Sequence, residues 1–204
     1  MAVLKPLFVT TISIFSLLHL SAQNAAISCP ANMIVKADAG KEGAVVSFPS
    51  LAGDMANATY TPASGSFLRL GSHSVIVTTA AGQKCSFTVM VTDNEAPYVS
   101  QLTLNRERLW PANDKLKRVS VNYYVSDNAG AVKTSLTIAS NATDGVKDYE
   151  IIDNNAMRLK ASRLPDGTPR IYIITVTAMD NAGNKTVRTT SISVSETMTA
   201  ISGM

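Results

Sequence analysis

The chain has 204 residues, of which 46% are hydrophobic and 16% are charged, and its formal net charge is +3. A chain this apolar can bury enough surface to offset the entropy of ordering, which excludes intrinsic disorder, and its length fits one large domain or two small ones. The weak, scattered charge excludes a nucleic-acid binder with a basic stripe, and two cysteines are too few for a cysteine-rich zinc module or a disulfide-dense mini-protein.

Residues 1–22 have the composition of a secretory signal peptide. Lys5 supplies a positive charge, Leu7 to Leu20 form an apolar stretch, and Ala22 is a small residue at the expected cleavage point. The stretch is short for a membrane span, which favours a cleaved signal over an uncleaved anchor. We therefore expect an exported mature chain without a membrane span.

Export bears on the interpretation of the two cysteines. An even pair in an oxidising compartment is most simply one disulfide, so Cys29 and Cys85 are expected to be bonded. The bond would close a loop of roughly 55 residues and stabilise the fold by about 4 kcal/mol in the chain-entropy treatment. The alternative is a lipoprotein with an acylated Cys29, but residues 26–28 do not fit that processing site and Cys85 would be left as a lone thiol.

The rest of the chain shows strand patterns and no sustained helical period. In the run 85–92 the odd positions are apolar and most even positions are polar, with Met90 as the exception, so one face is expected to be buried. Turn residues separate such runs at intervals of roughly 8–12 residues, which is the spacing of β-sandwiches. Further strands are expected at 33–35, 44–48, 74–79, 119–125, 132–138, 157–161, 171–178 and 186–194. The sequence therefore predicts an all-β protein.

The polar segment from Thr92 to Pro97 predicts a boundary between two domains. A long strand ends there, and a proline cannot continue a central strand. After the signal peptide at 1–22, the expected parts are a first β-sandwich at 23–97 and a second at 98–204 with a short C-terminal tail. Residues 24–97 carry 4 basic and 5 acidic side chains, against 13 and 10 in 98–204, so the two parts are near −1 and +3.

Three segments of the first part occur in a familiar order: Cys29–Met33 (CPANM), Cys85–Val89 (CSFTV) and the spacing from Asp93 to Pro97. Together they resemble the hyalin repeat, an extracellular immunoglobulin-like module associated with cell adhesion, over roughly 27–97. Residues 80–83 (AAGQ) depart from the family, which usually has an aspartate and a Gly-Asn turn there. The resemblance implies an immunoglobulin-like fold, without any ligand that depends on that aspartate.

Three segments of the second part carry a looser resemblance: Leu109–Lys115 (LWPANDK), Ser126–Gly130 (SDNAG) and Thr177–Asn184 (TAMDNAGN). They are similar to another immunoglobulin-like module of exported bacterial proteins. Asp114 stands where such modules often have histidine, and Ala129 where cysteine commonly follows Asp-Asn. Neither family has an established catalytic activity, so the resemblance implies a binding or structural role and does not identify the ligand.

An Asp-Asn pair follows a predicted strand three times, at positions 93, 127 and 180. Calcium prefers several carboxylate and carbonyl oxygens, and loops at a domain junction can supply them. The candidate calcium ligands are Asp93, Asn94, Glu95, Asp127 and Asp180, an arrangement similar to cadherin linkers. In the alternative interpretation these residues only form turns, by bonding their own backbone. The absence of a D-x-D-x-D motif favours turns.

Catalytic motifs are not found in the sequence. His73 is the only histidine after the signal segment, it reads as part of a turn before a strand, and no G-x-S-x-G motif accompanies it. One histidine and two bonded cysteines cannot build a zinc site, and no glycine-rich phosphate motif occurs. The separation of two glycosidase carboxylates depends on the fold, and no two acids stand out. We expect a protein without enzymatic activity.

Trp110, the only tryptophan, has two interpretations. An enclosed tryptophan buries a large apolar area, which favours packing in the core or between the domains. Its neighbours Arg106, Arg108 and Lys115 also make it a candidate platform for stacking on a sugar.

These features predict a secreted or cell-surface protein for adhesion or structural interaction. Its expected partner is an extracellular protein or glycan, not a nucleic acid, and unpaired strand edges offer a route to self-assembly. A carbohydrate-binding accessory protein is the alternative. Calcium is the only cofactor that the sequence indicates.

Overall fold

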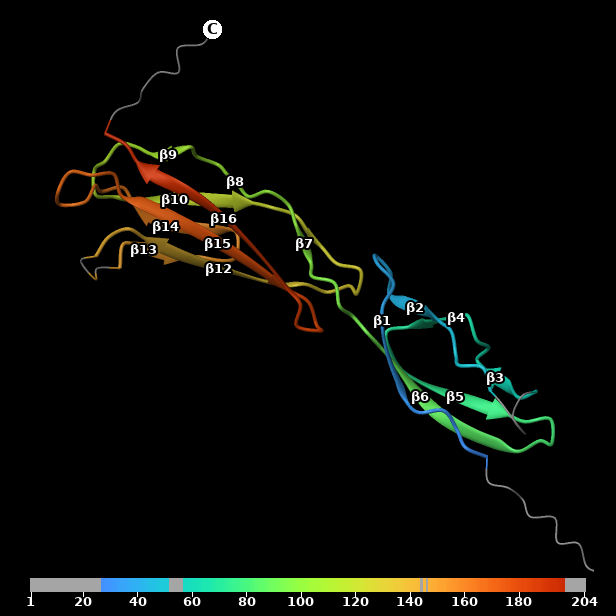
Figure 1. The fold of residues 1–204 in the computed structure, drawn as a ribbon. Helices are drawn as coiled ribbons and strands as arrows, with labels where there is room; N and C mark the ends of the chain where they lie inside the picture. Colours follow the sequence, from blue (N-terminus) through green and yellow to red (C-terminus); the bar gives the residue numbers. More distant parts are fainter. Residues whose placement is uncertain (1–26, 52–56, 144, 146, 197–204) are drawn as a thin grey trace, which may run out of the picture.

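The computed structural model describes residues 27–51, 57–143, 145 and 147–196, and every regular element within them is a β-strand. The strands form two halves that lie end to end (Figure 1), and each half has its own buried core. The prediction of an all-β fold with two tandem β-domains is confirmed. The predicted signal segment at 1–22 lies outside the described residues.

The first half contains six strands in two layers. They are β1 (Met33–Lys36), β2 (Gly43–Val46), β3 (Thr59–Thr61), β4 (Ser66–Arg69), β5 (Gly71–Thr78) and β6 (Lys84–Thr92). One sheet has the order β1-β6-β5-β3, with β1 parallel to β6, and the other pairs β2 with β4. Phe87 on β6 packs in the core with its ring 5.6 Å from that of Phe48 and 6.2 Å from that of Tyr60.

The expected disulfide joins the segment before β1 to the start of β6. Cys29 and Cys85 are bonded, with their Cα atoms 5.8 Å apart, so this prediction is confirmed. The bond ties the beginning of the first half to its longest strand.

The second half contains ten strands. They are β7 (Tyr98–Val99), β8 (Thr103–Leu104), β9 (Arg108–Leu109), β10 (Leu116–Asn122), β11 (Val125–Ser126), β12 (Lys133–Ser140), β13 (Tyr149–Ile151), β14 (Ala156–Lys160), β15 (Ile171–Met179) and β16 (Lys185–Val194). The two main sheets have the orders β13-β14-β10-β8 and β12-β15-β16-β9. Leu109, Met157 and Tyr172 are fully buried between them.

A buried ion pair lies beside this core. Arg170 Nη1 donates to Asp148 Oδ2, and the two side chains are only 5% and 4% exposed. Arg170 Nε also donates to the Ser162 carbonyl oxygen at 3.2 Å, and Ser140 Oγ donates to Asp148 Oδ2 at 3.0 Å. The pair therefore links the start of β15 to the segment before β13 and to the end of β12.

The outer edge of β12 is covered at one point by a side chain. Among the described strands, β12 pairs with β15 alone. Near its start, Asn154 Nδ2 donates to the Thr134 carbonyl oxygen at 2.9 Å. This amide takes the place that the backbone of a further strand would occupy.

In the long strands, buried and exposed side chains alternate as the sequence predicts. On β6, Phe87, Val89 and Val91 are buried, while Met90, the apolar exception, is 39% exposed on the outer face.

The expectation for His73 is wrong in one respect: it lies inside β5 and not in a turn, with Nε2 2.6 Å from the Arg69 carbonyl oxygen. The described residues contain no helix with the length and apolar character of a membrane span.

Candidate metal centre

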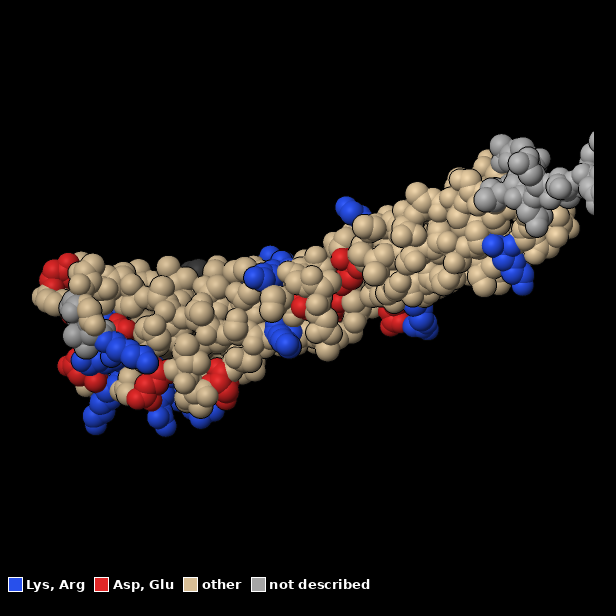
Figure 2. Space-filling view, turned by 90° about the horizontal axis from the view of Figure 1, so that it is seen from below, with Lys and Arg blue, Asp and Glu red and all other residues tan. Residues whose placement is uncertain are grey.

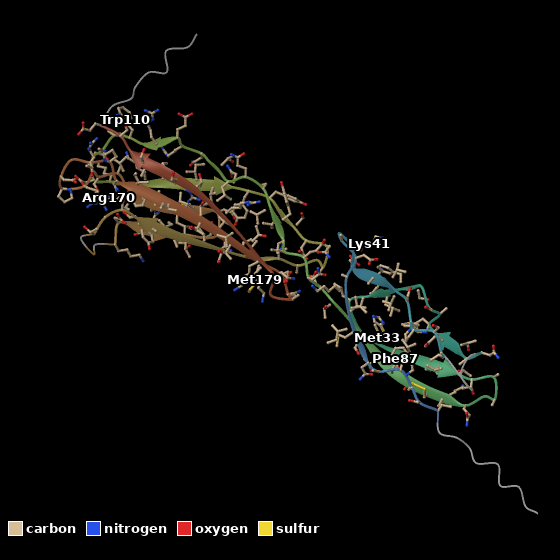
Figure 3. The ribbon with its side chains drawn as sticks, viewed as in Figure 1. Met33, Lys41, Phe87, Trp110, Arg170 and Met179 are labelled. Carbon is tan, nitrogen blue, oxygen red and sulfur yellow. A yellow bond between two sulfur atoms is a disulfide. The ribbon has the colours of Figure 1, made fainter. Side chains whose placement is uncertain are left out.

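Three loops bring an aspartate each to the place where the halves meet. Asp93 follows β6, Asp127 follows β11 and Asp180 follows β15. One carboxylate oxygen of each lies within 4.8 Å of those of the other two. Met179, the neighbour of Asp180, and Lys41 lie on opposite sides of this junction (Figure 3), and acidic side chains reach the surface near the middle of the molecule (Figure 2).

Each aspartate uses an oxygen to hold its own loop. Asp180 is 3% exposed, and its Oδ1 accepts from the backbone N–H groups of Gly183 at 2.7 Å and Asn184 at 2.9 Å. Asp127 Oδ1 accepts from Ala129 N at 2.8 Å, and Asp93 Oδ1 accepts from Glu95 N at 3.1 Å. The turn interpretation is therefore correct for these oxygens, and the turns fix the direction of the remaining ones.

Two of the remaining oxygens have no hydrogen-bond donor among the described residues. Asp93 Oδ2 and Asp127 Oδ2 are buried and unpartnered, whereas Asp180 Oδ2 accepts from Asn184 Nδ2 at 2.8 Å. Removing a carboxylate oxygen from water without a partner is unfavourable. Oxygens bound to one calcium ion lie at most about 5 Å apart, because each is about 2.3–2.6 Å from the ion. The spacing of the group and its two unpartnered oxygens fit a cation.

Repulsion among the carboxylates of this group also favours the binding of a cation. Burial raises the pKa of Asp127, and the nearby carboxylates of Asp93, Asp180 and Glu95 raise it further, against the hydrogen bond from Ala129. For Asp180, burial acts in the same direction, but hydrogen bonds led by those from Asn184 outweigh it and lower the pKa. A divalent cation would remove the repulsion that acts on Asp127.

Glu95, one of the five predicted ligands, lies outside the group of three carboxylates. Both carboxylate oxygens of Glu95 accept from Gly40 N, at 3.0 and 2.9 Å, so Glu95 faces the turn between β1 and β2. The role of Asn94 as a ligand stays a prediction. The role of Glu95 depends on a residue 55 positions earlier, and no local pattern indicates it.

The halves also touch directly at the junction. Asn128 Nδ2, from the loop after β11, donates to the Lys41 carbonyl oxygen of the first half at 2.9 Å. Beside this bond is an open cleft of about 260 Å³, lined by Glu42, Arg69 and Leu70 of the first half and Ala129 of the second. This contact between the halves was not expected from the sequence.

Trp110 lies far from this junction, at the other end of the second half (Figure 3). The residue is 39% exposed, so the expectation that it packs in the core or between the domains is wrong. The reason is strand alternation: Leu109, the preceding residue on β9, is fully buried, which directs the next side chain outward.

Comparison with known proteins identifies no family for this chain. No family profile and no curated protein matches the sequence. Similar solved structures include protocadherin gamma B7 extracellular cadherin domains 1–4 (13% identity, TM-score 0.34, 82% of this chain and 48% of that one). Others are mouse protocadherin-24 EC1-3 (10%, 0.30, 86% and 64%) and the human desmocollin-1 ectodomain (14%, 0.28, 83% and 36%).

The chain spans less than two thirds of the length of each of these structures. With similarity this distant, function has to be argued from the residues of the chain. The resemblance of residues 27–97 to the hyalin repeat stays a prediction, since no family profile matches.

Proposed function

We propose that this chain is a secreted or cell-surface protein without catalytic activity, whose two β-domains serve adhesion or structural interaction and are held together by calcium. The observation that carries the proposal is the group of Asp93, Asp127 and Asp180, in which three loops supply oxygens within 4.8 Å of one another. In this proposal the first domain is a hyalin-repeat-like module ending at Pro97, and the second begins at Tyr98.

Calcium would act as a cross-link between the domains. Asp93 belongs to the segment that leaves the first half, while Asp127 and Asp180 belong to loops of the second. The unpartnered oxygens of Asp93 and Asp127 would bind the ion directly, and backbone carbonyls or water would complete the six to eight ligands that calcium takes. Binding would favour one relative orientation of the two domains, which an extended interaction surface needs.

Other features support an exported, non-catalytic role. The disulfide between Cys29 and Cys85 suits an oxidising compartment. His73, the one histidine in the described chain, contacts a backbone carbonyl inside a strand, which does not suit a general base.

Thermal unfolding of the oxidised mature chain tests the calcium site. Extracellular calcium modules have dissociation constants of about 0.1–1 mM. Free calcium at ten times the dissociation constant would stabilise the folded chain by about 1.4 kcal/mol. We expect calcium to raise Tm relative to EDTA, and Asp127→Asn to abolish the rise. The matched control is Asp166→Asn. Asp166 Oδ1 also accepts a hydrogen bond from a backbone N–H two residues later, but Asp166 lies outside the group of three aspartates. Equal calcium responses in the two variants would contradict the proposal.

Capture from surface extracts tests the interaction role. The oxidised mature chain is immobilised in calcium and exposed to extracts treated with protease or with glycosidase. Loss of binding only after protease supports protein-directed adhesion, and no binding from any extract contradicts it.

Carbohydrate binding is the second candidate, and the 39% exposure of Trp110 favours it. Aromatic rings with an exposed face can stack on sugars, and an exposed indole reports such contact by its fluorescence. Soluble polysaccharides that bind there would shift or quench the emission of Trp110. An unchanged emission across a glycan panel, together with capture that survives glycosidase, would exclude this candidate.

A further inference from the structure

The turn between β1 and β2 is held by internal hydrogen bonds and projects toward the second half (Figure 3). Lys41 N donates to the Asp38 carbonyl oxygen at 3.0 Å, and Asp38 Oδ2 accepts from Val45 N at 3.1 Å. Gly40 has φ of 70°, a left-handed conformation in which glycine is unstrained. Because the turn is braced from within, a contact with it positions the whole first half.

Two side chains from outside the turn hold it at consecutive residues. Glu95, in the segment between the halves, accepts from Gly40 N with both carboxylate oxygens, at 3.0 and 2.9 Å. Asn128, in the second half, donates to the Lys41 carbonyl oxygen at 2.9 Å. The turn, the connecting segment and a loop of the second half are thus joined by hydrogen bonds that involve none of the three clustered aspartates.

From this geometry we infer that Asn128 and Glu95 form a latch that sets the relative orientation of the two domains without any metal. The inference deepens the proposed function, on which it rests, because calcium then rigidifies an orientation that the latch has already selected. Asn128 follows Asp127 directly, so the same loop carries the latch and a candidate metal ligand. Without a cation, the repulsion among the carboxylates acts on this loop, and the latch opposes it.

The latch also shapes the cleft beside it. Ala129, next to Asn128, forms the second-half side of that cleft, and the ion pair of Glu42 and Arg69, at 2.7 Å, stands on the first-half side. Because its lining comes from both halves, the cleft exists only while the latch holds them in this orientation. Opening the latch would move these two sides apart.

Distance measurement between the halves tests the inference. Spin labels at Ser86→Cys on β6 and Ser191→Cys on β16 report one distance across the junction, since both positions are exposed and the native cysteines are bonded to each other. In EDTA we expect a narrow distance distribution for the otherwise unchanged chain and a broad one for Asn128→Ala. One net hydrogen bond corresponds to a change of about 2- to 10-fold in the population of the latched orientation.

The matched control is Asn154→Ala. Asn154 also donates its amide to a backbone carbonyl at 2.9 Å, but it does so within the second half. A narrow distribution for Asn154→Ala and a broad one for Asn128→Ala support the latch, and Glu95→Ala should broaden the distribution as well. Equal distributions for Asn128→Ala and the unchanged chain in EDTA would overturn it.

The calcium arm keeps this test separate from that of the proposed function. Added calcium should narrow the distribution of Asn128→Ala if the metal centre operates. If calcium has no effect on any variant, the metal proposal fails, while the comparison in EDTA still decides the latch.

Discussion

Removal of the Arg170 guanidinium should strongly destabilise the second half. The Arg170 and Asp148 side chains are 5% and 4% exposed, so Arg170→Met would leave the Asp148 carboxylate buried without its counter-ion, although the Ser140 hydroxyl would still donate to it. Breaking one side of a buried pair costs about 3–5 kcal/mol, because the remaining charge is uncompensated. The Ser162 carbonyl oxygen would also lose a donor.

Urea unfolding followed by circular dichroism measures this loss, and a thermal scan gives the same answer in degrees. For a domain of roughly 100 residues, 3 kcal/mol corresponds to a fall in Tm of at least about 12 °C. The matched control is Arg158→Met, because Arg158 pairs with Glu150 at 3.1 Å but the two side chains are 53% and 51% exposed. That exposed pair should contribute less than about 1 kcal/mol.

A double variant, Asp148→Asn with Arg170→Met, separates lost packing from the lone charge. It should be more stable than Arg170→Met, because no buried carboxylate is left without its counter-ion. If Arg170→Met costs no more than Arg158→Met, or if the double variant is the less stable one, the reasoning from burial is refuted.

Three further outcomes are expected. Reduction of the disulfide between Cys29 and Cys85 should lower the stability of the first half by about 4 kcal/mol in urea, leaving the second half unchanged, and equal losses in both halves would contradict this. In EDTA, Asp127→Asn should raise Tm at pH 7, because burial raises the pKa of Asp127 in the folded state. The protonated form of Asp127 therefore contributes to folding stability fully below the unfolded pKa of about 3.9. This contribution is lost as the pH rises through the folded-state pKa. The gain from Asp127→Asn should therefore vanish below pH of about 3.9, and a gain independent of pH would point to another cause. Trp110→Ala should cost well below the about 3–5 kcal/mol of an enclosed tryptophan, and acrylamide should quench its fluorescence readily, whereas a protected emission would restore the core interpretation.

Periodicity in the sequence predicted the long strands and their buried faces because both are local properties. β6, β12, β15 and β16 each have seven or more residues, enough for alternation to be recognised. β7, β8 and β11 have two residues each, and only pairing with distant strands makes them strands. Such pairs carry no periodic signal: β7 and β8 were not predicted, and the strand expected at 119–125 reaches β11 only at Val125.

The candidate metal centre was predictable in part. Repetition of Asp-Asn after strands singled out Asp93, Asp127 and Asp180, which the fold brings together. Their convergence depends on the path of the chain through the second half, which spacing in the sequence does not encode. Glu95 lies close to Asp93 in the sequence and was predicted as a ligand for that reason, yet its carboxylate accepts from the backbone N–H of Gly40. For Trp110, alternation from Leu109 was the better guide than the general tendency of tryptophan to be buried.

The amide of Asn154 on the edge of β12 has a consequence for behaviour at high concentration. β12 is eight residues long, and long open edges are the sites at which identical chains stack into cross-β fibrils. With the Thr134 carbonyl oxygen already bonded, an incoming strand would have to displace a side chain before its first hydrogen bond could form at that end. We therefore expect Asn154 to oppose amyloid-type growth, and Asn154→Ala to shorten the lag time of fibril formation without altering the folded domain.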